Sequence, residues 1–418
     1  MGYQKAMRDY LKREHPEVWN WFASTEAQAD YTASVELELL KSTYRMDRDH
    51  HADLYQMTDK AAERLQLDVP ITLYQSQDVG INSAALYYTP GQGHVVLIGK
   101  TLTLLTAAEV RAAIGHELAH FLLWTEDDGD FLVADRLLAT LSNEPRAQPC
   151  HVESARLYQL YTEIYADHGA LIVSQNMETV VSTLVKIHTG LESVDPSSYL
   201  AQAEEIFAKD NPTTEGQTHP EVFIRARAIR LWSNGPVDVK DNTLASMNAR
   251  DPDTEKQIMG MIEGPPKVGE LDLLGQELLS RLTKDLVNLF LQPTWLRTEK
   301  MLAHARLFFP QDNDLSDQGR DMVFQRITAL QPYTQETADF FTYVLLDFAT
   351  VDRDLEQNGL VAALKLADEL GIGDRLEKVA MKELNAKKRD LTRLRKDAVQ
   401  LMQSAAEQIR EQTNDSDV

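Results

Sequence analysis

The chain has 418 residues, of which 43% are hydrophobic, so it can bury a large core and is expected to form two or three domains. Its formal net charge of -23 argues against nonspecific nucleic-acid binding and disfavours contact with anionic membranes. No stretch approaches about 18 uncharged apolar residues, so we expect no integral membrane segment. The N-terminal sequence lacks an apolar signal core and the chain has a single cysteine, Cys150, which together favour a cytoplasmic location.

A small sheet is predicted after a charged, helical lead-in that spans residues 1–70. Three segments rich in strand-forming residues follow the lead-in, and a Gly-containing turn at Pro90–Gly93 joins the last two. These strands are Ile71–Tyr74, Ala84–Tyr88 and His94–Ile98. We expect an antiparallel sheet whose edge, at Ala84, Ala85 and Leu86, binds an extended substrate peptide through backbone hydrogen bonds.

A helix with a marked start follows the predicted sheet. Thr106 and Glu109 fit a capping box, in which each side chain bonds the other's backbone amide. Val110, Ile114 and Leu118 then recur at helical spacing, which predicts a face buried against a core. Side chains on such a helix have rigid support.

The strongest chemical signal lies on this helix, in the sequence His116-Glu117-Leu118-Ala119-His120. His116 and His120 fall one turn apart on one face, which is the spacing that lets two imidazoles bind one zinc ion. Glu117 is left free to act on a bound water. The alternative is that both histidines lie on an ordinary polar helix face.

A second predicted helix, from Leu157 to Val173, carries Glu163 and Asp167 one turn apart. Glu163 can complete a site of two histidines and one glutamate, leaving a fourth position for water as a catalytic zinc ion requires. Asp167 would then lie behind the metal and accept the second ring proton of a histidine ligand, with His116 as the expected partner. Taken alone, such an acidic pair is usually a solvated helix face.

The third motif is Thr218-His219-Pro220, with Arg225 six residues after the histidine, where a loop enters a helix. With the two preceding motifs, it resembles the pattern of the HtpX-like and CAAX prenyl endopeptidase family of gluzincin zinc metallopeptidases. The resemblance covers about residues 70–235. It implies a zincin-like α+β catalytic domain at 71–235, mainly helical with a small sheet.

The resemblance also implies roles for individual residues. It assigns His116, His120 and Glu163 as zinc ligands, Glu117 as general base and acid, and Asp167 as a support for the histidine. His219 would stabilise the oxyanion of a tetrahedral intermediate, or would instead occupy the open zinc position and hold the enzyme inactive. Arg225 is expected to be a structural ion-pair partner rather than a substrate contact.

Two features depart from the family pattern. The segment between Asn82 and the Gly91–Gly93 turn is longer than usual, which would reshape the substrate groove. Related family members carry membrane-spanning helices, and no candidate span exists here, so we expect a soluble enzyme.

The second half of the chain has a different character. Polar residues with Gly and Pro predict a linker over 236–267, followed by an all-helical C-terminal domain over 268–418 that ends in a disordered tail. Residues 335–385 weakly resemble the TerB-like domain of tellurite-resistance proteins, in which Asp347 and Asp352 would bind a cation. Polar residues in helix turns are the simpler interpretation of both. We expect this domain to bind a protein partner.

The sequence therefore predicts a zinc-dependent metalloendopeptidase with one Zn²⁺ per chain, in which Glu117 activates a zinc-bound water and protein or peptide substrates are hydrolysed. The alternative is an inactive scaffold, latched by His219, that acts through its C-terminal domain. The presence of Glu117 counts against this alternative, because only catalysis needs the base.

Overall fold

The chain folds into two compact units in the computed structural model. One comprises Met1–Pro265 with Asp272–Leu274, and the other Pro266–Leu271 with Gly275–Val418. The structure describes residues 2–76, 83–89, 91–210, 212–214, 219–234, 251–263, 268–308, 320–331, 334–355 and 357–398. Asn82, Pro90 and the expected disordered tail lie outside the described residues, as does most of the expected linker.

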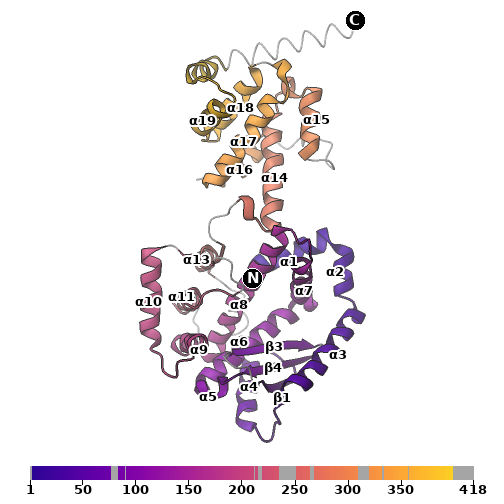
Figure 1. Cartoon of the computed structure of the whole chain (residues 1–418), viewed down its shortest axis with the longest axis vertical. Coiled ribbons are helices and arrows are strands. Elements are labelled where there is room, and N and C mark those ends of the chain that lie inside the picture. The colour runs from indigo at the N-terminus through magenta and orange to yellow at the C-terminus, as the bar shows by residue number, and fades with distance from the viewer. Residues whose placement is uncertain are drawn as a thin grey trace. The chain divides into compact units, whose positions relative to one another are not determined.

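The first unit is mainly helical with a small sheet, as predicted (Figure 1). Its helices are α1 (Gly2–Glu14), α2 (Pro16–Phe22), α3 (Thr25–Ser42), α4 (Ala52–Arg64), α5 (Thr101–Leu104), α6 (Ala107–Thr125), α7 (Asp130–Asn143), α8 (Pro149–Ser174), α9 (Met177–Thr189), α10 (Pro196–Lys209), α11 (Val222–Ser233) and α13 (Pro252–Glu263). Its strands are β1 (Tyr44–Arg45), β2 (Ile71–Ser76), β3 (Ser83–Thr89) and β4 (Gln92–Ile98). None of the described helices is long and apolar enough to cross a membrane.

The sheet has the order β1-β2-β4-β3, with β3 at one edge. β3 and β4 are antiparallel, with Leu86 opposite Val95. The sheet is mixed rather than antiparallel throughout, because β2 pairs with β4 in parallel, with Ile71 opposite Gly93. Consecutive segments usually pair, but β4 is buried along nearly its whole length, and such a continuous apolar strand is typical of the centre of a sheet.

Helices cover both faces of the sheet. On one face Leu73, Val95 and Leu97 pack into the core that also holds the predicted apolar stripe of α6. On the other face Tyr74 and Val96 pack against α3. The alternation along β2 and β4 follows the two-residue period of a strand. Helix α6 is thus fixed against the sheet, beside the edge strand β3.

The remaining elements of the first unit pack around this centre. In the N-terminal lead-in, Trp19 is buried against α7, whereas the neighbouring Trp21 is exposed. Within the expected linker, α13 contributes Ile258 and Met261 to the core that surrounds α11. The described part of the linker is therefore a packed helix of the first unit.

The regular elements of the second unit are all helices within its described residues. Its helices are α14 (Leu273–Phe290), α15 (Glu299–Phe308), α16 (Arg320–Thr328), α17 (Gln335–Val351), α18 (Asn358–Glu369) and α19 (Gly373–Glu383). Asp347 accepts a hydrogen bond from His304 at 2.6 Å if that ring carries its proton on Nε2, and Asp352 pairs with Lys300 at 3.2 Å. Both carboxylates thus have partners within the chain, which favours the structural interpretation over cation binding.

Candidate metal centre

The capping box predicted at the start of α6 is confirmed. The Thr106 hydroxyl accepts a hydrogen bond from the Glu109 backbone N–H, and the Glu109 carboxylate accepts one from the Thr106 backbone N–H at 2.8 Å. The same carboxylate accepts hydrogen bonds from Ser182 at 2.6 Å and Lys186 at 2.9 Å, both on α9. Glu109 therefore caps α6 and also ties it to a second helix, a contact that the sequence does not show.

Helices α6 and α8 approach each other very closely because each presents a glycine to the other. A Cβ atom at Gly115 of α6 would lie 2.7 Å from Val173 of α8, and one at Gly169 of α8 would lie 2.2 Å from Ala119 of α6. Real side chains do not tolerate such contacts, so larger residues at these positions would force the helices apart. This close packing sets the distance between the histidines of α6 and the carboxylates of α8.

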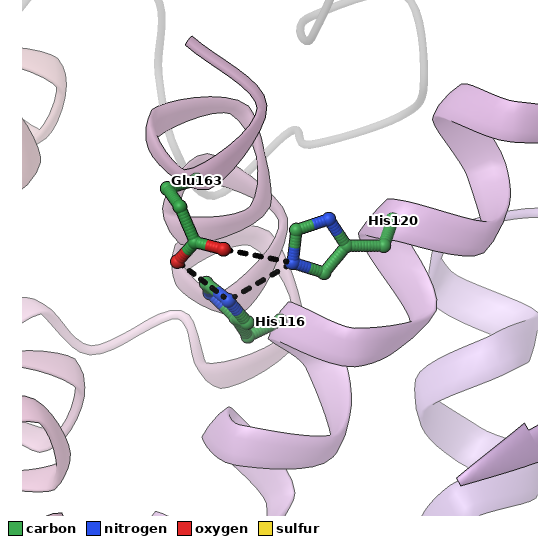
Figure 2. A group of neighbouring side chains, drawn as sticks. All are labelled: His116, His120 and Glu163. Atoms are coloured by element: carbon green, nitrogen blue, oxygen red, sulfur yellow. Dashed lines mark hydrogen bonds and ion pairs between the residues drawn. The ribbon is translucent and has the colours of Figure 1, made fainter. Parts of the chain in front are cut away.

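Three side chains converge between these helices. Figure 2 shows His116 and His120 on one helix facing Glu163 on the other. The Nε2 atoms of the two histidines are 3.2 Å apart, and they lie 3.5 and 3.6 Å from the two Glu163 carboxylate oxygens. Ligand atoms bound tetrahedrally to zinc at about 2.0–2.2 Å lie roughly 3.4 Å from one another. The donor set and its spacing therefore fit a zinc ion.

Asp167 and Arg225 lie behind this group. The fully buried Asp167 carboxylate is 3.0 Å from His116 Nδ1 and accepts two hydrogen bonds from the Arg225 guanidinium, each 2.7 Å long. Arg225 also lies 3.5 Å from Glu163. The guanidinium thus neutralises the carboxylates of Asp167 and Glu163, and the Asp167 contact fixes which His116 nitrogen faces the other two side chains.

Burial and neighbouring groups shift the pKa values of the two histidines in opposite directions. Burial lowers the pKa of His116, but hydrogen bonds with Asp167 and Glu163 outweigh it and raise that pKa above its ordinary value. Burial and the charge of His116 lower the pKa of His120 to about 4. His120 therefore presents a neutral nitrogen, whereas a proton on His116 competes with a metal ion.

Glu117 lies beside this group and is buried. Burial raises the pKa of its carboxyl to about 7; the charge of His116 opposes this rise and that of Glu163 adds to it. The backbone N–H of Leu86, on the edge strand β3, donates a hydrogen bond to it. A carboxyl with a pKa near neutrality is suited both to accept and to return a proton.

These residues line one cavity of about 530 Å³. Ala84, Ala85 and Leu86 form one of its walls, so the structure places the expected substrate strand next to Glu117. His219 also lines the cavity, with its side chain 66% exposed and its Nε2 3.7 Å from Glu163. It is near the three converging side chains but does not join them.

Sequence reasoning missed several residues of the cavity wall. They are Trp124 at the end of α6, Asp135 of α7, and Val180, Thr183, Leu184 and Ile187 of α9. The sequence does carry a weak signal for Asp135. The run Phe131–Leu138 is apolar except for Asp135 and Arg136. A carboxylate within an otherwise apolar segment is an informative departure from the usual pattern.

A histidine pair and a glutamate on two packed helices, with a further glutamate at their side and an edge strand along the cavity, form an arrangement compatible with a zincin site. Over 215 residues, or 47% of this chain, the sequence is 27% identical to plastoglobule-localized metallopeptidase 48, chloroplastic, of Arabidopsis thaliana. The chain spans 61% of the length of that relative. No family profile and no solved structure matches. Nearly half of the chain is thus distantly similar to a metallopeptidase, and the chain carries a His-His-Glu group that could hold a metal ion.

Proposed function

We propose that the chain is a zinc-dependent metalloendopeptidase that hydrolyses peptide bonds of protein or peptide substrates. The observation that carries this proposal is the convergence of His116, His120 and Glu163 at spacings that fit tetrahedral zinc, with Glu117 directly beside them. The catalytic domain would comprise residues 71–235. One Zn²⁺ held by these three side chains would polarise the scissile carbonyl and acidify a water molecule.

The other steps belong to the protein's own side chains. Glu117 would take a proton from the attacking water and later deliver it to the leaving amine, a role for which its raised pKa is suited. Asp167 would keep His116 oriented, and Arg225 would hold Asp167 in place. His219, exposed at the rim of the site, would donate a hydrogen bond to the oxyanion that forms on the substrate.

An extended peptide would lie along the outer edge of β3, which pairs with no further strand among the described residues. Strands at an edge leave every second backbone N–H and C=O unpaired, and these groups can bind a peptide of almost any sequence. Because Leu86 donates to Glu117, a peptide on this edge would pass next to the base. The cytoplasmic location and a protein partner for the second unit remain predictions.

The test compares cleavage of an unfolded protein by the zinc-loaded wild type, the Glu117→Gln variant and the His120→Ala variant, with fragments identified by mass spectrometry. We expect cleavage by the wild type alone. Zinc analysis should find the metal in Glu117→Gln but not in His120→Ala, since only the second loses a ligand. Near wild-type cleavage by Glu117→Gln would overturn the proposal.

The alternative function is a latched scaffold, in which His219 closes the site and the second unit binds a partner. It is favoured if wild type binds zinc yet cleaves nothing, while His219→Ala gains cleavage. The distance of His219 from Glu163 and its exposure favour the catalytic role.

A further inference from the structure

The cavity runs along α6, and its two ends differ in chemistry. Ala112 and Ala113 line it near the start of the helix, together with apolar side chains of α9. Trp124 lines it near the end of the helix, together with Asp135 of α7. Because a helix rises about 1.5 Å per residue, these ends lie on the order of 17 Å apart, with the histidines between them.

At the second end, polar groups lack partners. Trp124 Nε1 and His120 Nδ1 are buried and, within the described residues, make no hydrogen bond. The Trp124 ring lies against the His120 ring, with centroids 5.8 Å apart. Buried polar groups in proteins almost always have partners, so a hydrogen bond to either atom would be favourable.

Asp135 is the charged group at this end. The side chain is partly buried, and burial raises the pKa of its carboxyl to about 6. The charge of the neighbouring Arg136 opposes that rise. Among the described residues, the Asp135 carboxylate forms no ion pair within bonding distance. A carboxylate that is partly desolvated and has no bonded partner among the described residues gains from an incoming cation.

We propose that Asp135 forms an anionic subsite that binds a positively charged group of the substrate, either a lysine or arginine side chain or a free α-amino group. This inference rests on the proposed peptidase function and names its substrate class. The indole of Trp124, which lines the same cavity, adds a π face that attracts a cation. The net charge of -23 favours encounters with basic substrates as well.

The opposite end of the cavity is apolar, which would give a bound substrate a preferred direction. Val180, Leu184 and Ile187 offer an apolar surface there, and the Arg225 charge is already paired with Asp167 and Glu163. A substrate with a basic residue on one side of the scissile bond and an apolar residue on the other would match both ends. A substrate with the reverse order would not.

The experiment uses fluorogenic peptides that are identical except at one position, which carries Lys, Arg or Gln and is moved along both sides of the cleaved bond. A second pair differs only in a free or acetylated N-terminus, which separates side-chain from α-amino recognition. We expect the wild type to prefer a cationic peptide by about tenfold in kcat/KM at one position or at the N-terminus. Asp135→Asn should bring that ratio close to one, and Asp135→Glu should retain part of it.

Glu144→Gln is the matched control, because Glu144 is an exposed acidic residue just after α7 and does not line the cavity. This variant changes the net charge by the same amount as Asp135→Asn and should keep the preference for cationic peptides. Thermal unfolding of each variant verifies its fold. The proposal is overturned if the wild type shows no cationic preference, or if Asp135→Asn retains it.

Binding gives a readout that does not depend on turnover. Labelled Lys and Gln peptides are titrated by fluorescence anisotropy into Glu117→Gln and into the double variant Glu117→Gln/Asp135→Asn. The subsite is supported if Glu117→Gln binds the Lys peptide more tightly than the Gln peptide and the double variant loses this difference. If that result is obtained but the wild type cleaves no peptide, only the peptidase proposal fails. Equal binding of both peptides to Glu117→Gln overturns the subsite.

Discussion

Gly169 on α8 faces Ala119 on α6 so closely that a methyl group on Gly169 would lie 2.2 Å from the Ala119 Cβ. The glycine lies two residues from Asp167, and the alanine lies next to His120. The spacing of His116, His120 and Glu163 therefore depends on the absence of a side chain at position 169.

Gly169→Ala should weaken zinc binding and destabilise the first unit. The added methyl group must push α6 and α8 apart, which costs about 1–3 kcal/mol and separates Glu163 from both histidines. Zinc affinity measured by competition with a chromophoric chelator should fall at least about tenfold. Gly260→Ala is the control: a Cβ there meets nothing within 4 Å, so this change should be neutral or stabilising by up to about 1 kcal/mol. Unchanged zinc affinity in Gly169→Ala would show that the helices do not set the ligand spacing.

Asp167→Asn should lower zinc affinity by about 10–100-fold while leaving the three candidate ligands in place. The amide cannot supply the negative charge that orients His116, and it leaves Arg225 without its two-hydrogen-bond partner. The same chelator competition measures the loss. Asp130→Asn removes a carboxylate that pairs with Lys12 away from the cavity and should leave zinc affinity unchanged.

His219→Ala should reduce kcat and leave zinc affinity within about threefold of wild type, because His219 is exposed and outside the group of converging ligand atoms. Steady-state kinetics with a cleavable peptide, together with zinc titration, separates the two effects. A rise in kcat would instead identify His219 as a latch on the open position.

Glu109→Gln should destabilise the first unit by about 3 kcal/mol at pH 7, because the buried Lys186 would lose its ion-pair partner. Burial alone would raise the pKa of Glu109, but hydrogen bonds from Ser182, the Thr106 backbone and Lys186 outweigh it and lower that pKa. A lowered pKa in the folded state means stability that is present above the unfolded-state pKa and lost as pH falls through the folded-state value.

The difference in unfolding free energy between wild type and Glu109→Gln should therefore narrow below about pH 4. Denaturant unfolding at several pH values measures it. Glu205→Gln breaks an exposed pair with Lys209 and should cost at most about 0.5 kcal/mol. A gap between wild type and Glu109→Gln that stays constant down to pH 3 would contradict the assigned role of the carboxylate.

The sequence by itself determined the features that depend on helical periodicity. The capping box at Thr106 and Glu109 is confirmed, and the spacing of His116 and His120 placed both on one face of α6. Glu163 and Asp167 likewise fall on one face of α8, where both reach His116. Such relations involve neighbours a few residues apart, and local backbone geometry fixes them whatever the rest of the fold does.

Tertiary structure alone decided which of these surfaces meet. Pairing of β2 with β4 in parallel, the Glu109–Lys186 ion pair and the position of Asp135 at one end of the cavity all join residues far apart in the chain. Contacts between distant segments depend on the packing of whole helices, such as the close approach at Gly169, and leave no periodic signal in the sequence.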